Sequence, residues 1–289
     1  MNIADEIKES FKKGSVLTRL IYVNISVFLF IRVINVFFFL LNREFTLLNW
    51  LAQPADIDQL LSKPWTLITY MFLHFNFLHI LFNVLWLYWM GKIFLFYFDQ
   101  KKLLSIYLLG GLSGGLFFLA GYNLFPAFTE VVVFSQLLGA SASVLAIIAA
   151  VATYAPNHII NLMFIGQVKM KHLAIFSLLL YVIGIASSNA GGNLAHLGGA
   201  FFGFIYVLAY RKGIDLTRGL TALTDFFVAT FKPKQRIELT YRGKNNDLEF
   251  NRQKNLKQEE INRVLDKISQ SGYDSLTKEE KELLFKMGK

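Results

Sequence analysis

The stretch VLTRLIYVNISVFLFIRVINVFFFLL, Val16–Leu41, decides the fold of this chain. It contains no acidic residue, and its only charged side chains are Arg19 and Arg32. A helix of about 20 consecutive, predominantly apolar residues is needed to cross the hydrocarbon core of a bilayer. The apolar core of a cleavable signal sequence is shorter, roughly 7–15 residues. This stretch therefore predicts a membrane-spanning helix rather than a signal sequence.

Five further apolar runs follow along the chain. They are about Phe77–Phe98, Leu103–Leu124, about Leu137–Ala155, Leu173–Ala186 and Ala195–Tyr210. The last two are shorter than the roughly 18 residues that usually mark a membrane helix, so the charges in the flanking loops are needed to support them. The prediction is an all-α, polytopic membrane protein with a bundle of six transmembrane helices.

The composition separates a membrane domain from a polar tail. The chain is 54% hydrophobic and 17% charged, whereas a soluble domain is about 45–50% apolar and about 25% charged. We predict a cytoplasmic N-terminal segment over residues 1–15, a membrane domain over 16–212 and a cytoplasmic tail over 213–289. In the tail we expect a polar linker, Pro233–Asn255, and short amphipathic helices, one of which opens on a capping box at Thr277–Glu280.

The loop charges choose one topology. Cytoplasmic loops carry an excess of Lys and Arg. With the N-terminus inside, the basic pairs Lys101–Lys102 and Arg211–Lys212 lie in the cytoplasm, whereas Arg43 and Lys63 lie outside. We therefore expect a multi-pass cell-membrane protein with both termini in the cytoplasm. The net charge of +9 is explained by these loops, so no nucleic-acid partner is expected.

Polar side chains inside the apolar runs indicate function, because they are costly in a bilayer. Ser141 and His196 each lie near the outer start of a span that runs inward, so we predict that they meet at one depth. A serine hydroxyl becomes a useful nucleophile when a neighbouring base accepts its proton, and a neutral imidazole suits that task. Since the spans contain no carboxylate well inside them, the pair would be a dyad and not a triad.

His79 and Asn83 are the candidate donors to an oxyanion. They are four residues apart and so share one face of the second span, at a similar depth to Ser141. Preorganised donors stabilise the negative oxygen that forms when a serine attacks a carbonyl. Together with the backbone N–H of Ser141, these two side chains would supply such donors.

Other interpretations of these residues were weighed. Ser113, in Gly111–Gly114, fits the pattern G-x-S-G, but its span runs the other way and its small neighbours favour helix packing. Ser143 is a second rival nucleophile. His74, His79 and His196 could form a metal site, yet no carboxylate accompanies them, so no metal and no cofactor is expected. The absence of cysteine excludes disulfides and thiolate nucleophiles.

Three motifs in register resemble the rhomboid family of intramembrane serine proteases. They are HFNFLHILFN at His74–Asn83, GASA at Gly139–Ala142 and AHLGGAFFG at Ala195–Gly203. The resemblance covers about residues 16–212. It implies that Ser141 is the nucleophile, that His196 is the general base, that His79 and Asn83 border the oxyanion hole, and that Gly139 belongs to the loop that shapes it.

The chain departs from the family pattern at three places. Ala142 replaces the usual glycine after the serine, and Trp65-Thr66 stands where a Trp-Arg pair is common. Leu145 replaces an aromatic residue that often stacks on the base. The first two are tolerable variations, and the third leaves open how His196 is oriented.

The resemblance implies an intramembrane serine endopeptidase that cuts transmembrane segments of other membrane proteins. The alternative is a non-catalytic rhomboid-like protein that binds membrane clients, but such proteins lose the serine or the histidine, and both are present here. A transporter is disfavoured, because no intramembrane carboxylate or internal repeat is evident. The expected partners are transmembrane substrates and the lipid bilayer, and the expected location is a bacterial inner membrane. The oligomeric state is left open.

Overall fold

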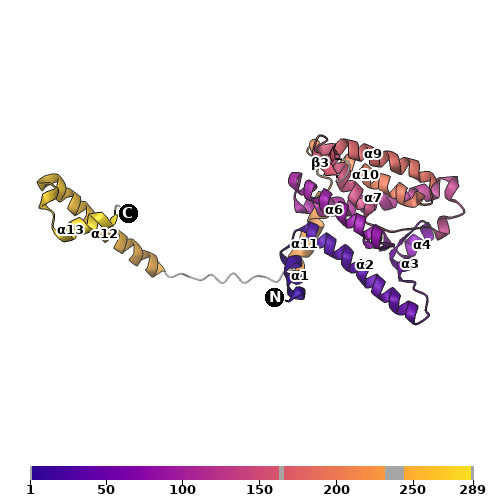
Figure 1. The fold of residues 1–289 in the computed structure, drawn as a ribbon, viewed down its shortest axis with the longest axis horizontal. Helices are drawn as coiled ribbons and strands as arrows, with labels where there is room; N and C mark the ends of the chain where they lie inside the picture. Colours follow the sequence, from indigo (N-terminus) through magenta and orange to yellow (C-terminus); the bar gives the residue numbers. More distant parts are fainter. Residues whose placement is uncertain (1, 163–165, 232–243, 288–289) are drawn as a thin grey trace. The chain divides into compact units, whose positions relative to one another are not determined.

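The computed structural model describes residues 2–162, 166–231 and 244–287. Its internal contacts divide the chain into two units, Met1–Phe231 and Lys232–Lys289, coloured from indigo to orange and in yellow tones in Figure 1. We call the first the bundle unit and the second the tail unit. The charge pattern places the domain boundary after Lys212, whereas the internal contacts place it after Phe231, at the end of the next helix.

The bundle unit is built from helices at all six predicted runs. They are α2 (Val16–Leu40), α6 (Phe77–Tyr97), α7 (Gln100–Leu124), α8 (Ser141–Tyr154), α9 (Met170–Ile183) and α10 (Ala190–Arg211). By length and composition four described helices can cross a membrane, namely α2, α6, α7 and α10, while α8 and α9 are apolar but shorter. The count of six spans therefore stays a prediction.

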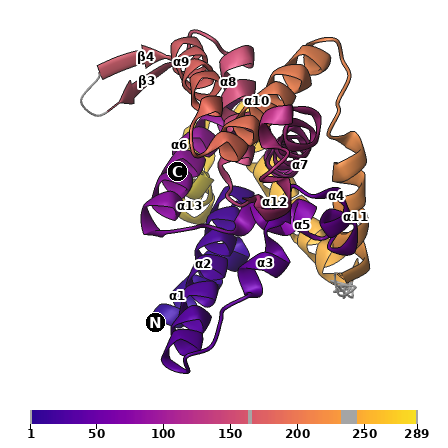
Figure 2. The same ribbon diagram turned by 90° about the vertical axis from the view of Figure 1, so that its right-hand side faces the viewer.

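Three helices, α7, α8 and α10, form the centre of the bundle. Their backbones approach closely because small residues face one another. A Cβ built on Gly199 would lie 2.1 Å from the Ala142 carbonyl oxygen, and one built on Gly203 would lie 2.1 Å from the Ala146 carbonyl oxygen. Every described side chain of α8 from Ala142 to Ala152 is buried. The helices α2 and α9 lie on opposite outer sides of the bundle (Figures 1 and 2) and expose apolar side chains, as lipid-facing helices do.

The segment before α2 and the first loop contain short elements. A short helix, α1 (Ile3–Lys13), precedes α2, and the loop holds α3 (Leu47–Leu51), β1 (Gln53–Pro54), α4 (Ile57–Ser62) and α5 (Thr66–Thr69). Trp50 and Trp65 stack with ring centroids 6.3 Å apart, and the Trp65 Nε1–H donates to the Trp50 carbonyl at 2.8 Å. These contacts join α3 to the residue just before α5.

The loop also sets where α8 begins. Strand β1 pairs antiparallel with β2 (Gln136–Leu137), which fixes the residues just before Ser141. Gly139 then has φ +129°, a value that a helix does not allow. The prediction that this helix starts at about Leu137 was therefore wrong, and Ser141 is its first residue.

Two further boundaries differ from the prediction. An antiparallel pair, β3 (Ile159–Leu162) and β4 (Gly166–Lys169), joins α8 to α9 and was not predicted. Helix α10 begins at Ala190, so His196 lies almost two turns inside it rather than at its start. The asparagine and glycines that open α10 lowered the apolar signal there without preventing a helix.

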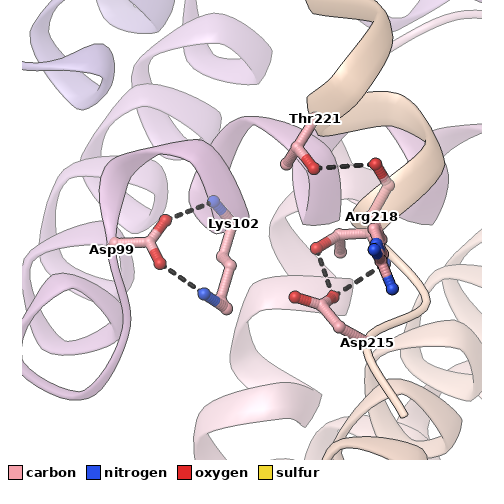
Figure 3. Close-up of polar contacts among 6 residues, drawn as sticks. Asp99, Lys102, Asp215, Arg218 and Thr221 are labelled. Carbon is pink, nitrogen blue, oxygen red and sulfur yellow. Dashed lines mark hydrogen bonds and ion pairs between the residues drawn. The ribbon is translucent and has the colours of Figure 1, made fainter. Parts of the chain in front are cut away.

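Polar contacts surround the start of helix α11 (Arg218–Phe231) and the start of α7, and Figure 3 shows the local ones. Asp99 caps α7 by accepting from the Lys102 backbone N–H at 2.9 Å and also pairs with the Lys102 ammonium. Asp215 accepts from the backbone N–H and the hydroxyl of Thr217, just before α11. An ion pair of 2.7 Å between Lys101 and Asp225 then joins α11 to the start of α7.

The tail unit contains α12 (Lys244–Ser271) and α13 (Lys278–Met287). The predicted linker was wrong from Lys244 onward, where α12 begins, and residues 233–243 lie outside the described residues. The capping box is confirmed: the Thr277 N–H donates to Glu280 at 2.8 Å and the Glu280 N–H to the Thr277 hydroxyl at 3.3 Å. Lys267 on α12 pairs with Glu280 at 2.9 Å and is the main cause that lowers the pKa of that carboxyl.

Candidate active site

Ser141 and His196 meet inside the bundle. His196 Nε2 lies 2.6 Å from Ser141 Oγ, although the two residues are 55 apart in the sequence. Helices α8 and α10 bring them together, since Gly199 lets the α10 backbone pass close to Ala142, the residue after the serine. The structure thus places the predicted pair in direct hydrogen-bonding contact.

The position of Ser141 at the start of α8 favours negative charge beside it. The first backbone N–H groups of a helix have no acceptor within the helix, and the helix dipole is positive at this end. The Ser141 N–H is one of these groups. An oxyanion that forms on a carbonyl attacked by Ser141 would therefore lie near a free donor and the positive end of the helix dipole.

His79 lies against the loop that precedes the serine. A Cβ built on Gly139 would lie 2.9 Å from His79 Nε2 and 3.6 Å from Ser141 Oγ, so the three residues converge on one point. The Phe75 backbone N–H donates to His79 Nδ1 at 3.3 Å. Because Nδ1 is the acceptor, a neutral His79 carries its proton on Nε2, the nitrogen that faces Gly139. That tautomer makes His79 a donor toward the serine.

Asn83 supports the same arrangement one turn further along α6. Its Nδ2 donates to the His79 carbonyl at 2.8 Å, which uses one of the two amide hydrogens and leaves the second available. His74 is buried before the start of α6, with its ring centroid 5.1 Å from that of His79, and it packs against the site.

A cavity of about 360 Å³ opens beside these residues. Its wall includes His79, Asn83, Ser141 and His196, the four polar residues that the sequence analysis placed at one depth. Apolar side chains complete it, from Phe82 and Trp86 on α6, Val144, Leu145 and Ile148 on α8, and Tyr181 on α9.

The two rival serines point elsewhere. The Ser113 hydroxyl donates to the Gly198 carbonyl at 2.8 Å, which joins α7 to α10 in the packing role predicted for it. Ser143 is fully buried, and a Cβ built on Gly111 of α7 would lie 2.6 Å from its hydroxyl oxygen. Neither serine lines the cavity that contains His196.

The structure accounts for one departure from the family motif. Ala142 is buried, and its methyl group faces Gly114, where an added Cβ would lie only 2.5 Å away. The side chain that the motif normally lacks is thus accommodated by a glycine on α7.

Tyr181 is a candidate site residue that the sequence analysis missed. Its ring lies edge-on against the His196 imidazole, with centroids 4.3 Å apart and planes at 63°. The signal was weak, because Tyr181 stands in an apolar run with no motif around it. Only Ser177, one turn earlier on the same face, marks that side of α9 as facing the cavity.

A family model for the Rhomboid domain matches residues 61–213. The chain belongs to the rhomboid family. The matched region includes His79, Asn83, Gly139, Ser141 and His196, and it begins after α2. A second model, described as a family of unknown function (DUF6576), matches residues 244–287 of the tail unit.

Curated relatives carry the name rhomboid protease GlpG. The protein of Serratia proteamaculans (strain 568) is 37% identical over 94 residues, which cover 27% of this chain and 34% of that protein. The protein of Yersinia pseudotuberculosis serotype I is 26% identical over 166 residues, which cover 57% of this chain and 55% of that protein. This rhomboid therefore spans a third to about half of the length of these relatives.

Proposed function

We propose that this rhomboid is an intramembrane serine endopeptidase with Ser141 as nucleophile and His196 as general base. The observation that carries the proposal is the 2.6 Å contact between Ser141 Oγ and His196 Nε2 beside a cavity. A hydroxyl in this position can pass its proton to the imidazole as it attacks, so the nucleophile and its base are already paired.

The reaction proceeds by acyl transfer. Ser141 Oγ bonds to the scissile carbonyl carbon while its proton moves to His196 Nε2, and the carbonyl electrons become an oxyanion. The Ser141 N–H, His79 Nε2–H and the second amide hydrogen of Asn83 are the candidate donors to that oxygen. His196 then protonates the leaving amine as the peptide C–N bond breaks, and a water molecule hydrolyses the acyl-enzyme by the same route.

The substrate class follows from the chemistry of a site within a bilayer. A transmembrane helix satisfies its own backbone hydrogen bonds, so it must unwind locally before its carbonyl can be attacked. Residues of low helix propensity, such as Gly, Pro or β-branched types, ease that unwinding. Because Gly139, Ala140 and Ala142 surround Ser141, a small residue before the scissile bond fits best. We propose single-span substrates that are cut near the outer end of the span.

The cellular setting is part of the same proposal. The positive-inside rule favours six spans with both termini in the cytoplasm, and the relatives named above are bacterial proteins. A bacterial inner membrane is the proposed location. A reporter fused after Lys289 should be active in the cytoplasm.

A fluorophosphonate probe in detergent or liposomes tests the proposal, because it labels only a serine that a base has activated. The wild-type chain should be labelled and should cut a transmembrane reporter, and Ser141→Ala should abolish both. Ser113→Ala and Ser143→Ala are the matched controls and should keep most of both. Labelling that survives in Ser141→Ala would contradict the assignment. A chain that binds the reporter without labelling or cutting would be the non-catalytic alternative.

A further inference from the structure

Among the described residues, only one of the two ring nitrogens of His196 has a hydrogen-bonding partner. Its Nε2 faces Ser141, while the buried Nδ1 has no partner atom within the described residues. In a Ser-His-Asp triad the third residue bonds to that nitrogen and holds the imidazole in place. The orientation of His196 must therefore come from packing against its ring.

Tyr181 supplies this packing. Among the described residues, it is the one aromatic residue whose ring packs against the His196 imidazole, with centroids 4.3 Å apart and planes at 63°. Aromatic pairs favour such an edge-to-face geometry. Tyr181 is half-buried and lines the cavity together with His196. A ring so close to the imidazole restricts its rotation out of line with Ser141.

The side chain on α8 that could compete for this place is aliphatic. Leu145 lies one turn after Ser141, on the same helix face, and lines the same cavity. It has no ring to stack on His196. An aromatic side chain at 145 would approach the imidazole from α8, whereas in this chain the aromatic ring approaches from α9.

We propose that Tyr181 is the positioning residue for the base, His196. From its place on α9, Tyr181 supplies the aromatic contact that Leu145 on α8 does not provide. The inference rests on the proposed function, since it assigns a role through His196. It has a structural consequence. Tyr181 stands in the last turn of α9, a helix with Met170 as its one buried residue, so the alignment of the base depends on how α9 rests against α10.

Four variants test the inference: Tyr181→Leu, Tyr181→Phe, the double variant Tyr181→Leu with Leu145→Phe, and the control Tyr122→Leu. Tyr122 stacks on Phe128 at 4.5 Å and does not line the cavity, so its replacement removes a comparable aromatic contact elsewhere. The measurements are kcat and KM for a transmembrane reporter, the rate of fluorophosphonate labelling, and Tm.

Tyr181→Leu should lower kcat and the labelling rate by about 10-fold to 100-fold with KM little changed, because a small misplacement of a catalytic group has an effect of this size. Tyr181→Phe should keep near wild-type rates, since the ring remains. The double variant should recover at least about 5-fold of the lost rate, since the new ring at 145 can reach the imidazole. Tyr122→Leu should leave kcat unchanged.

The inference is overturned if Tyr181→Leu keeps the wild-type kcat, if Tyr181→Phe loses as much as Tyr181→Leu, or if the ring at 145 restores nothing. Ser141→Ala, measured beside these variants, distinguishes failure of the positioning role from failure of the proposed function. Loss of activity in Ser141→Ala with a normal Tyr181→Leu would reject the positioning role alone. Full activity in Ser141→Ala would reject the proposed function itself.

Discussion

The two sides of the cavity are held together by different forces. On one side, Ser141 and His196 are placed by close packing of α8 against α10, with Gly199 at the point of contact. On the other side, His79 is placed by hydrogen bonds to the turn before α6: the Phe75 N–H donates to its Nδ1, and its own N–H donates to the Asn76 side-chain oxygen. Packed backbones respond steeply to added volume, whereas a hydrogen-bonded turn can lose one contact and adjust.

Gly199→Val should cause the largest effect, because it acts on the packed side. The new Cβ would lie 2.1 Å from the Ala142 carbonyl oxygen, which is backbone and cannot move aside cheaply. We expect a loss of at least about 3 kcal/mol in stability and loss of probe labelling. Tm in detergent and labelling of Ser141 measure the two effects.

Gly219→Ala is the matched control for Gly199→Val. Gly219 lies in α11, where an added Cβ meets nothing within 4 Å, so its replacement should leave Tm and labelling unchanged. A Gly199→Val protein with wild-type Tm and labelling would show that α8 and α10 are not held at the separation described here.

Gly139→Ala should disturb the point where the two sides of the cavity meet, between His79 and Ser141, while most of the fold stays intact. The residue has φ +129°, and its new methyl group would press on His79 Nε2 at 2.9 Å. Removing one oxyanion donor typically lowers kcat by about 10²-fold to 10³-fold. We expect a loss of about 10²-fold in kcat, measured with a cleaved reporter.

Gly166→Ala separates backbone strain from contact with the site. Gly166 also has a positive φ, +88°, but an added Cβ there meets no atom of the described residues within 4 Å. Both variants place an alanine at a sparsely populated positive φ, which costs on the order of 1–3 kcal/mol, so Tm should fall in both while kcat falls only in Gly139→Ala. Equal losses of kcat would mean that strain, and not the contact with His79, is responsible.

The sequence predicted the helices and the meeting of Ser141 with His196 for physical reasons. Long apolar runs have few alternatives to a helix in a bilayer, and alternating span directions place the two residues at one depth. The sequence could not predict the start of α8, because β1 and β2 are two residues each and such short strands carry no periodicity. Tyr181 was missed for a related reason: its contact with His196 depends on how α9 is rotated about its axis, and an apolar run with weak periodicity does not determine that rotation.

Arg32 is the clearest case of a residue that the sequence singled out without explaining. In the structure its guanidinium donates to the Phe75 carbonyl and stacks over the Phe28 ring at 5.4 Å. Phe75 is also the residue whose N–H donates to His79 Nδ1. A cation within an apolar helix thus bonds to the backbone of the turn that fixes His79, in keeping with the rule that intramembrane charges pair with polar groups such as backbone carbonyls.

Arg32→Gln should therefore produce the smallest effect of the three, a loss of several-fold in kcat with KM and Tm little changed. The change removes one charge-assisted hydrogen bond to the turn, while the Asn76 cap at the start of α6 and the Asn83 bond to the His79 carbonyl remain. Lys92→Gln is the matched control, because Lys92 also lies well inside a predicted span and its described contacts are with Tyr88 on its own helix. If Lys92→Gln lowers kcat as much as Arg32→Gln, the loss of an intramembrane charge causes the effect. If only Arg32→Gln does so, the hydrogen-bonded side of the cavity depends on α2, which lies outside the region matched by the family model.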